Sequence, residues 1–151
     1  MAHSKNTNQL RKIRFDYEVM ETFEAGLELT GIEVKSIRTH SPSLDGAYIG
    51  VRGGEAFVFK MHIPPYQASN TPDGYDADRI RRVLLTKKEI RKLADTESGK
   101  GLTIVPVKVY NKGRKIKLEV AIVRGKKKFD KREDIKKRES DRDIQRTLKG
   151  E

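Results

Sequence analysis

The sequence predicts a mainly β protein: a small antiparallel Greek-key β-barrel (OB-fold type) with a short capping helix, one longer helix and a basic C-terminal tail. Three observations lead to this prediction. One long stretch alternates apolar and polar residues, two Thr-x-x-Glu motifs each open a short helical pattern, and 18 of the last 26 residues are charged. Strands arranged around one intervening helix fit such a barrel. A split sheet with one covering helix is the alternative.

The alternating stretch covers residues 15–29. Its odd-numbered positions, which include Phe15, Tyr17 and Leu29, are mostly apolar, and its even-numbered positions are mostly polar. This period of two is typical of a strand with one buried face. A strand of this length in a small domain has to bend, and Gly26 is the position that best permits a bend. Long bent strands are how small barrels close.

The period changes at Thr30. Thr30 and Glu33 have the spacing of a capping box, in which a hydroxyl and a carboxylate satisfy free amides at a helix start. The predicted helix is short and has two faces. One face is apolar, with Val34 and Ile37, and seals an end of the barrel. The other face presents the cations Lys35 and Arg38 to solvent.

Two hairpins are predicted further along the chain. Residues 47–51 and 56–63 alternate across Arg-Gly-Gly-Glu, a turn with two glycines. Residues 102–110 and 115–123 flank Asn-Lys-Gly-Arg, and Pro106 indicates an edge strand or a bulge. The inward positions of the last strand are Ile116, Leu118, Val120 and Ile122.

A loop and a helix separate the two hairpins. Residues 64–82 contain three prolines and no periodicity, which predicts a long loop. Thr86 and Glu89 form a second capping box, opening a helix that ends by Gly99. Its inward-facing residues are Ile90, Leu93 and Ala94.

Charge is the strongest global signal. Lys and Arg number 33 against 22 Asp and Glu, a net charge of +11, and the pI is about 9.8. Such a domain carries the electrostatic footprint of a nucleic-acid binder. The absence of cysteine excludes disulfides, thiolate metal sites and thiol redox chemistry. Neither a secretory signal nor a membrane-spanning run is found, so we expect a soluble, cytoplasmic protein without a membrane partner.

The composition divides the chain into an RNA-binding barrel, residues 1–125, and a basic tail, residues 126–151. From Arg124 to Glu151 there are 12 basic and 7 acidic residues. The few apolar residues in this segment cannot bury enough surface to offset the entropy of ordering it. We therefore expect the tail to be disordered when free and helical against a partner.

No catalytic or metal-binding pattern is found, and no cofactor is expected. The three histidines, His3, His40 and His62, share no metal-ligand spacing. The acidic cluster Asp73, Asp76 and Asp78 lacks the spacing of a calcium loop. We expect these aspartates to cap a helix or to pair with the nearby arginines.

Basic clusters give the positive evidence for RNA binding, because Lys and Arg contacts to phosphate supply affinity. Any single cluster of this kind is usually a solvated surface. The clusters are Arg11, Lys12 and Arg14; Lys35 and Arg38; Arg79, Arg81 and Arg82; and Lys126, Lys127 and Lys128.

Several motifs resemble the SsrA-binding protein family, also called small protein B. They are ETFEAGLELTGIEVKSIR, GEAFVFKMHIPPY, LLTKKEIRKL, GLTIVPVKVY and GKKKFDKREDIKKRE, in order from about Leu10 to Leu148. The resemblance implies an OB-type barrel that binds the tRNA-like domain of transfer-messenger RNA (SsrA RNA). It also implies a tail that enters the empty mRNA channel and decoding region of a stalled ribosome, leading to ribosome rescue and peptide tagging by trans-translation.

The resemblance implies roles for individual residues. It assigns Tyr17, Glu24, Lys35 and Arg38 to the RNA-binding surface, with Glu24 holding a cation or hydrogen-bonding RNA. Asp130, Lys131 and Arg132 match the tail motif that meets the decoding region, and Phe129 occupies its preceding aromatic or histidine position. The other tail residues assigned to the ribosome are Lys126, Lys127, Lys128, Ile135, Lys136 and Arg138.

The chain departs from the family pattern at five positions, and these affect the expected fine contacts. The family usually has asparagine at the position of Leu10, histidine at that of Phe15 and threonine at that of Ile32. It usually has proline at the position of Ala77 and tryptophan at that of Ser140.

Two other functions stay open from the residues alone. One is a single-strand RNA chaperone of cold-shock type, and the other is an RNA-processing enzyme that uses the aspartate cluster.

Overall fold

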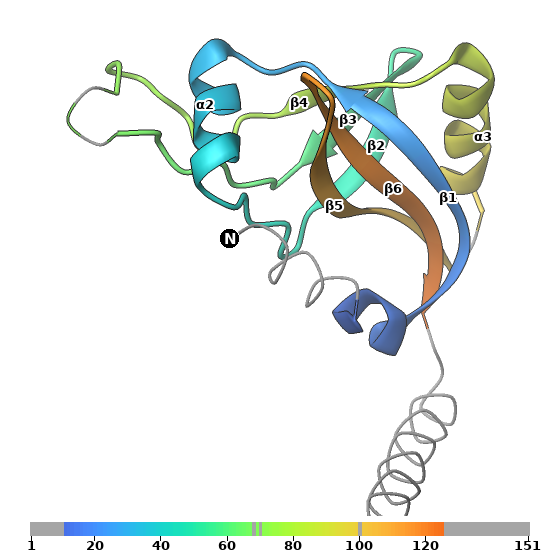
Figure 1. Cartoon of the computed structure of the whole chain (residues 1–151). Helices are drawn as coiled ribbons and strands as arrows, with labels where there is room; N and C mark the ends of the chain where they lie inside the picture. Colours follow the sequence, from blue (N-terminus) through green and yellow to red (C-terminus); the bar gives the residue numbers. More distant parts are fainter. Residues whose placement is uncertain (1–10, 68, 70, 100, 126–151) are drawn as a thin grey trace, which may run out of the picture.

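The computed structural model describes residues 11–67, 69, 71–99 and 101–125. Figure 1 shows a strongly curved sheet with helices beside it. The strands are β1 Tyr17–Leu27, β2 Tyr48–Arg52, β3 Glu55–Phe59, β4 Arg81–Leu84, β5 Leu102–Lys112 and β6 Lys115–Gly125. The helices are α2 Gly31–Thr39 and α3 Lys87–Glu97, and residues 11–16 are helical as well.

The strands form one sheet in the order β2-β3-β4-β1-β6-β5, and every neighbouring pair is antiparallel. The sheet curls so that its two edge strands, β2 and β5, approach each other. Among the described residues the sheet is not closed by a β2–β5 ladder. The predicted mainly β, antiparallel fold with a capping helix and a longer helix is therefore confirmed, whereas full closure of the barrel is not observed.

The first strand differs from its prediction at its start. It begins at Tyr17, and Phe15 lies in the helical segment 11–16. A β-bulge interrupts the pairing with β6 between Val19 and Glu21. Because a bulge inserts one residue, it moves the preceding side chains to the other face of the sheet.

The bulge gives the protein two apolar cores instead of one. Phe23 and Ala25 face the main core, together with the predicted inward residues of β6. Tyr17 and Val19 pack against a second, smaller core on the opposite face, so the prediction that all odd positions of β1 share one face is wrong. The buried members of the second core are Ile13, Val105, Val107, Ala121 and Val123.

The strand β4 lies partly inside the stretch that was predicted to be a loop. Its residues alternate between buried and exposed, with Arg81 and Val83 buried and Arg82 and Leu84 exposed. An arginine at an inward position hides the period of two, because the pattern depends on apolar residues there. The prediction of loop structure up to Arg82 is therefore wrong for its last two residues.

The hairpins and the second helix agree with their predictions, except that β3 ends at Phe59 and does not extend to Ile63 as predicted, because Lys60 has a left-handed backbone (φ 62°). Gly53 and Gly54 have φ of 60° and 77°, the left-handed backbone that the β2–β3 turn requires. Pro106 lies on the edge strand β5 and beside a second bulge. The helix α3 is capped by Thr86 and buries Leu93. Within the described part of the chain, none of the helices has the length and apolar character needed to cross a bilayer.

Candidate nucleic-acid interface

The capping helix α2 starts as the sequence predicts. Thr30 Oγ1 accepts a hydrogen bond from the Glu33 amide at 3.3 Å, and Glu33 Oε1 accepts one from the Thr30 amide at 2.9 Å. Ile37 is buried in the main core and Val34 packs against it. The helix therefore seals one end of the curved sheet (Figure 1).

Glu33 also anchors α2 to the segment that leads into β4. Its side chain is only 1% exposed; its Oε2 lies 2.6 Å from Arg81 Nε, and its Oε1 lies 2.6 Å from Arg79 Nη2. Burial alone would raise the pKa of Glu33. Hydrogen bonds from Arg79, Thr30 and Arg81 outweigh that effect and lower the pKa to about 2, so the carboxylate stays charged inside the protein.

This anchor changes the interpretation of the arginine cluster. Arg81 is 0% exposed and also donates to the carbonyl oxygens of Met61 and Ala77, so grouping it with the surface cations is wrong. Arg79 is partly exposed but holds Glu33. Arg82 is exposed and pairs with Glu28 and Glu55.

The aspartate cluster is arranged differently from its prediction. Asp78 Oδ1 lies 2.9 Å from His62 Nδ1, and Asp76 Oδ1 accepts a hydrogen bond from the Asp78 amide. The arginines that were expected to pair with these aspartates pair with glutamates instead. No group of three or more metal-ligating side chains occurs in the described ranges.

The outward face of α2 presents Lys35 and Arg38, as predicted. Both side chains are exposed, and neither makes an ion pair with any described residue. Ser36, between them in sequence, is buried and donates from its hydroxyl to the carbonyl of Pro64. The two cations therefore stand on a helix that is fixed to the body from its inner side.

Glu24 belongs to a polar cluster on the outer face of β1, β5 and β6. Its Oε2 accepts a hydrogen bond from the Tyr110 hydroxyl at 2.6 Å, and its Oε1 lies 2.9 Å from Lys112 Nζ. Glu24 stands opposite Glu119 across the β1–β6 pair, and Lys108 lies 3.7 Å from that second carboxylate. Glu24 thus pairs with a cation of its own chain, Lys112.

Electrostatics within this cluster hold Glu24 in its charged form. The hydrogen bond from Tyr110, followed by that from Lys112, lowers the pKa of Glu24 below its ordinary value. Burial and the hydrogen bond to Glu24 together raise the pKa of Tyr110 to about 12. Glu24 is therefore charged at neutral pH, and Tyr110 is the donor in the hydrogen bond between them.

The remaining predicted RNA-binding residues lie at the start of β1. Arg11 and Arg14 are exposed on the helical segment 11–16. Tyr17 is half-buried, because its ring packs against the second core. The assigned tail residues, Lys126, Lys127, Lys128, Phe129, Asp130, Lys131, Arg132, Ile135, Lys136 and Arg138, lie outside the described residues.

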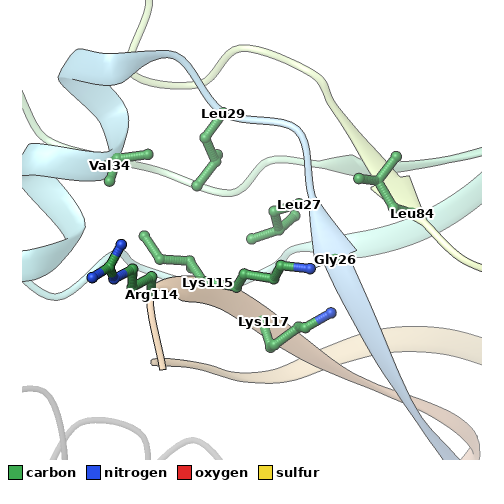
Figure 2. A pocket seen from close by; sticks show the side chains of 9 residues that line it. Gly26, Leu27, Leu29, Val34, Leu84, Arg114, Lys115 and Lys117 are labelled. Carbon is green, nitrogen blue, oxygen red and sulfur yellow. The ribbon is translucent and has the colours of Figure 1, made fainter. Parts of the chain in front are cut away.

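The structure adds one basic site that the sequence interpretation missed. The site lies at the turn between β5 and β6 and at the start of β6, beside a cleft of about 350 Å³. Its cations are Arg114, Lys115 and Lys117. Figure 2 shows these side chains facing a group of apolar ones from β1, α2 and β4. We name this feature the hairpin cleft; its lining residues are Gly26, Leu27, Leu29, Val34, Leu84, Arg114, Lys115, Ile116 and Lys117.

The signal for this site was present in the sequence. The stretch Gly113 to Lys117 contains three cations in four consecutive positions after a glycine. Taken alone it indicates only a turn, because nothing local indicates which apolar residues lie opposite the turn.

Comparison with known proteins gives consistent matches over most of the chain. The family model of SmpB protein matches residues 7–150. An SsrA-binding protein of Gloeothece citriformis is 48% identical over 139 residues, covering 92% of this chain and 90% of that protein. One from a Roseiflexus species is 45% identical, covering 92% and 88%. A chain of the solved structure "tmRNA-SmpB: a journey to the center of the bacterial ribosome" has a TM-score of 0.63 and 38% identity, covering 76% of this chain and 80% of that chain.

Proposed function

Because the chain belongs to the SmpB protein family, we propose that it is an RNA-binding adaptor of trans-translation. It binds the tRNA-like domain of transfer-messenger RNA and brings that RNA to stalled ribosomes, which leads to ribosome rescue and peptide tagging. The resemblance found in the sequence motifs is confirmed by the relatives, which are themselves SsrA-binding proteins. The similar solved structure places its own SmpB chain with tmRNA in a bacterial ribosome.

The observation that carries this proposal is the anchored cationic helix. Lys35 and Arg38 are exposed and make no ion pair with any described residue, and the buried ion pair of Glu33 with Arg81 fixes the helix that presents them. Side chains held in this way can match the phosphates of one folded RNA, whereas a uniform basic stripe would bind any strand. Glu24 supports the same surface by positioning Lys112.

The proposed role is one of binding and delivery, and it requires no covalent chemistry. The protein acts as an adaptor, and we infer that it has no enzymatic activity of its own. Its partners are an RNA and the ribosome, so its place of work is the cytoplasm.

The basic tail, residues 126–151, has a separate role in this proposal. The motif GKKKFDKREDIKKRE resembles the family segment that occupies the empty mRNA channel and the decoding region of the small subunit. Cations in this segment would meet ribosomal RNA phosphates, and a helix would form there because binding offsets the ordering cost. The body, residues 1–125, would hold the transfer-messenger RNA at the same time.

Competition for binding tests the proposed RNA specificity. The labelled tRNA-like domain is bound to the full-length protein at moderate salt, and unlabelled competitors are added. We expect the same RNA to compete at stoichiometric amounts and random single-stranded RNA of equal length to require a large excess. Equal competition by random RNA would favour the single-strand chaperone and would overturn the adaptor proposal.

A further inference from the structure

We propose that a pocket at the start of β1 takes one nucleotide, with the base against Tyr48 and the phosphate at Lys12. The pocket has a volume of about 350 Å³ and lies between the helical segment 11–16, residues 44–48 and β5. Tyr17, the first residue of β1, also lines it, so it lies at the opposite end of that strand from the hairpin cleft. We name it the Tyr48 pocket.

Tyr48 is the end member of a stack on the outer face of β2 and β3. Its ring lies on the ring of Phe59, with 5.0 Å between the two centroids and 14° between the two planes. The guanidinium carbon of Arg52 lies 5.6 Å from the centroid of Phe59. Gly50 lies between Tyr48 and Arg52 along β2, and a Cβ atom there would come within 2.9 Å of Phe59 Cε2. The Phe59 ring therefore lies over Gly50, between Tyr48 and Arg52.

The far end of this stack is fixed by α3. Glu97 Oε2 lies 3.6 Å from Arg52 Nη1, and Glu97 Oε1 accepts a hydrogen bond from the Val51 amide at 2.8 Å. One carboxylate thus holds both the backbone of β2 and the cation that lies against Phe59. A ligand that adds to a stack fixed in this way loses less free energy to the ordering of side chains.

The surface that remains for a ligand is the second face of Tyr48. Phe59 covers one face of its ring, whereas Tyr48 as a whole is 37% exposed and lines the pocket. Leu44 and Val105 line the same pocket from the segment before β2 and from β5. An aromatic ring with a free face, beside apolar walls, is a surface on which unpaired bases stack.

Polar groups of the pocket match the rest of a nucleotide. Lys12 supplies a cation for a phosphate. Its pair with Asp45, at 3.7 Å, joins two exposed side chains and is therefore weak enough for a phosphate to replace. The carboxylate of Asp16 can accept a hydrogen bond from the amino group of adenine, cytosine or guanine, and uracil has no such group. The hydroxyl of Thr103 can donate or accept one more.

A nucleotide uses all of these groups, and other ligands use only some. An aliphatic acid would bind Lys12 and leave the Tyr48 ring uncovered, and an aromatic side chain of a protein would cover the ring without an anion for Lys12. The pocket volume lies in the range of roughly 300–1,000 Å³ that is usual for small-molecule sites.

Two sources can supply the nucleotide, and the experiments distinguish them. Tyr17 pairs with Gly125 across β1 and β6, so the basic tail begins beside the pocket. In the proposed function this tail enters the decoding region, which would bring the pocket next to ribosomal RNA. A free mononucleotide offers the same base and phosphate, and its binding does not depend on the proposed function.

NMR titration of the full-length protein tests the pocket itself. The probes are AMP, CMP, GMP and UMP, and the resonances followed are the Tyr48 ring protons and the Thr103 methyl group. We expect saturable shifts at both residues, with UMP the weakest ligand because it has no amino group for Asp16. Removal of the phosphate, in adenosine, should weaken binding as well.

Variants show which contacts are responsible. Tyr48→Ala should weaken AMP binding by about tenfold, the order of effect of losing one stacked base, whereas Tyr48→Phe keeps the ring and should bind as the unmodified protein does. Lys12→Ala should bind AMP and adenosine equally. Lys88→Ala is the matched control, because Lys88 is exposed on α3 and does not line the pocket. Equal weakening by Lys12→Ala and Lys88→Ala would show that only net charge matters and would overturn the inference.

Photocrosslinking on the ribosome identifies the source. The full-length protein is bound with transfer-messenger RNA to stalled ribosomes and irradiated, and the peptide that contains Tyr48 is analysed for attached nucleotides. A ribosomal RNA nucleotide on this peptide would assign the pocket to the ribosome. Saturable binding of AMP without that crosslink would assign it to free mononucleotides. Absence of both would overturn the inference and leave the adaptor role intact, since binding of the tRNA-like domain is measured separately on the same preparation.

Discussion

Glu33 and Arg81 form an ion pair in which both side chains are buried, with 2.6 Å between Arg81 Nε and Glu33 Oε2. The two residues are 48 positions apart, and the pair joins α2 to β4. Glu33 also completes the capping box of α2. One carboxylate therefore fixes both the start of the cationic helix and its position on the sheet.

The first prediction concerns the cost of breaking this pair. Arg81→Ala leaves the buried Glu33 with the partly exposed Arg79 as its one cationic partner among the described residues, and removal of one member of a buried pair costs about 3–5 kcal/mol. We expect the free energy of unfolding, measured by urea denaturation, to fall by that amount. Arg82→Ala, at the adjacent exposed position, is the control and should change it by about 1 kcal/mol or less. Equal effects of the two substitutions would contradict the structural role of the pair.

The second prediction concerns acid stability. The pKa of Glu33 is about 2 in the folded protein and 4.5 ordinarily. Because folding lowers this pKa, the folded state binds the proton less tightly than the unfolded state, and the stabilisation is fully present above pH 4.5. It should be lost as the pH falls from 4.5 to 2, by about 3 kcal/mol in total.

NMR titration of the Glu33 carboxyl carbon gives the pKa directly, and urea denaturation at each pH gives the stability. In Glu33→Gln this ionisation is absent, so its stability should be lower at neutral pH and should fall less over the same window. Parallel stability curves for the two proteins would show that Glu33 does not contribute to acid unfolding.

The parts of the fold that depend on local sequence were predicted, and those that depend on distant partners were not. The capping boxes at Thr30 and Thr86 and the turn at Gly53 use residues within a few positions of one another. The bulge after Val19 has no local signature, because it is fixed by pairing with β6. A single inserted position was enough to put Tyr17 on the opposite face from its prediction.

The same division applies to the candidate site. The exposure of Lys35 and Arg38 follows from helical spacing, so the sequence could predict it. The burial of Arg81 could not be predicted, because an arginine is rarely buried without a partner and its partner lies on a distant helix. The hairpin cleft was missed for a related reason: its floor and its rim come from elements that are adjacent only in the folded protein.

The third prediction concerns the cationic face of α2. Replacing Lys35 and Arg38 by alanine should weaken binding of the tRNA-like domain and reduce its salt dependence. Each phosphate contact that is lost should lower the slope of log affinity against log salt by about 0.7 to 0.9. Thermal stability should change little, because both side chains are exposed. The double variant Lys87→Ala/Arg91→Ala removes the same charge from α3 and serves as the control. Equal slopes for the two double variants would assign Lys35 and Arg38 to the solvated surface.

The basic tail is the subject of the last prediction, and it concerns the division of roles along the chain. The strand β6 ends at Gly125, and its inward residues Ile116 and Leu118 are already buried in the main core. We propose that residues 126–151, which are mostly charged, are not needed for the body to fold. The folded body and the segment proposed to enter the ribosome should therefore be separable.

Removing Phe129 to Glu151 should leave a protein that melts cooperatively and binds the tRNA-like domain at nearly full strength. It should fail to support peptide tagging on stalled ribosomes, because the segment proposed to occupy the decoding region is absent. Both activities have to be measured on one preparation, with the full-length chain as the reference. Normal tagging by the truncated chain would refute the decoding role of the tail. Parallel loss of RNA binding and tagging would instead place the tail within the RNA site, since loss of a positively charged segment weakens phosphate contacts wherever they are made.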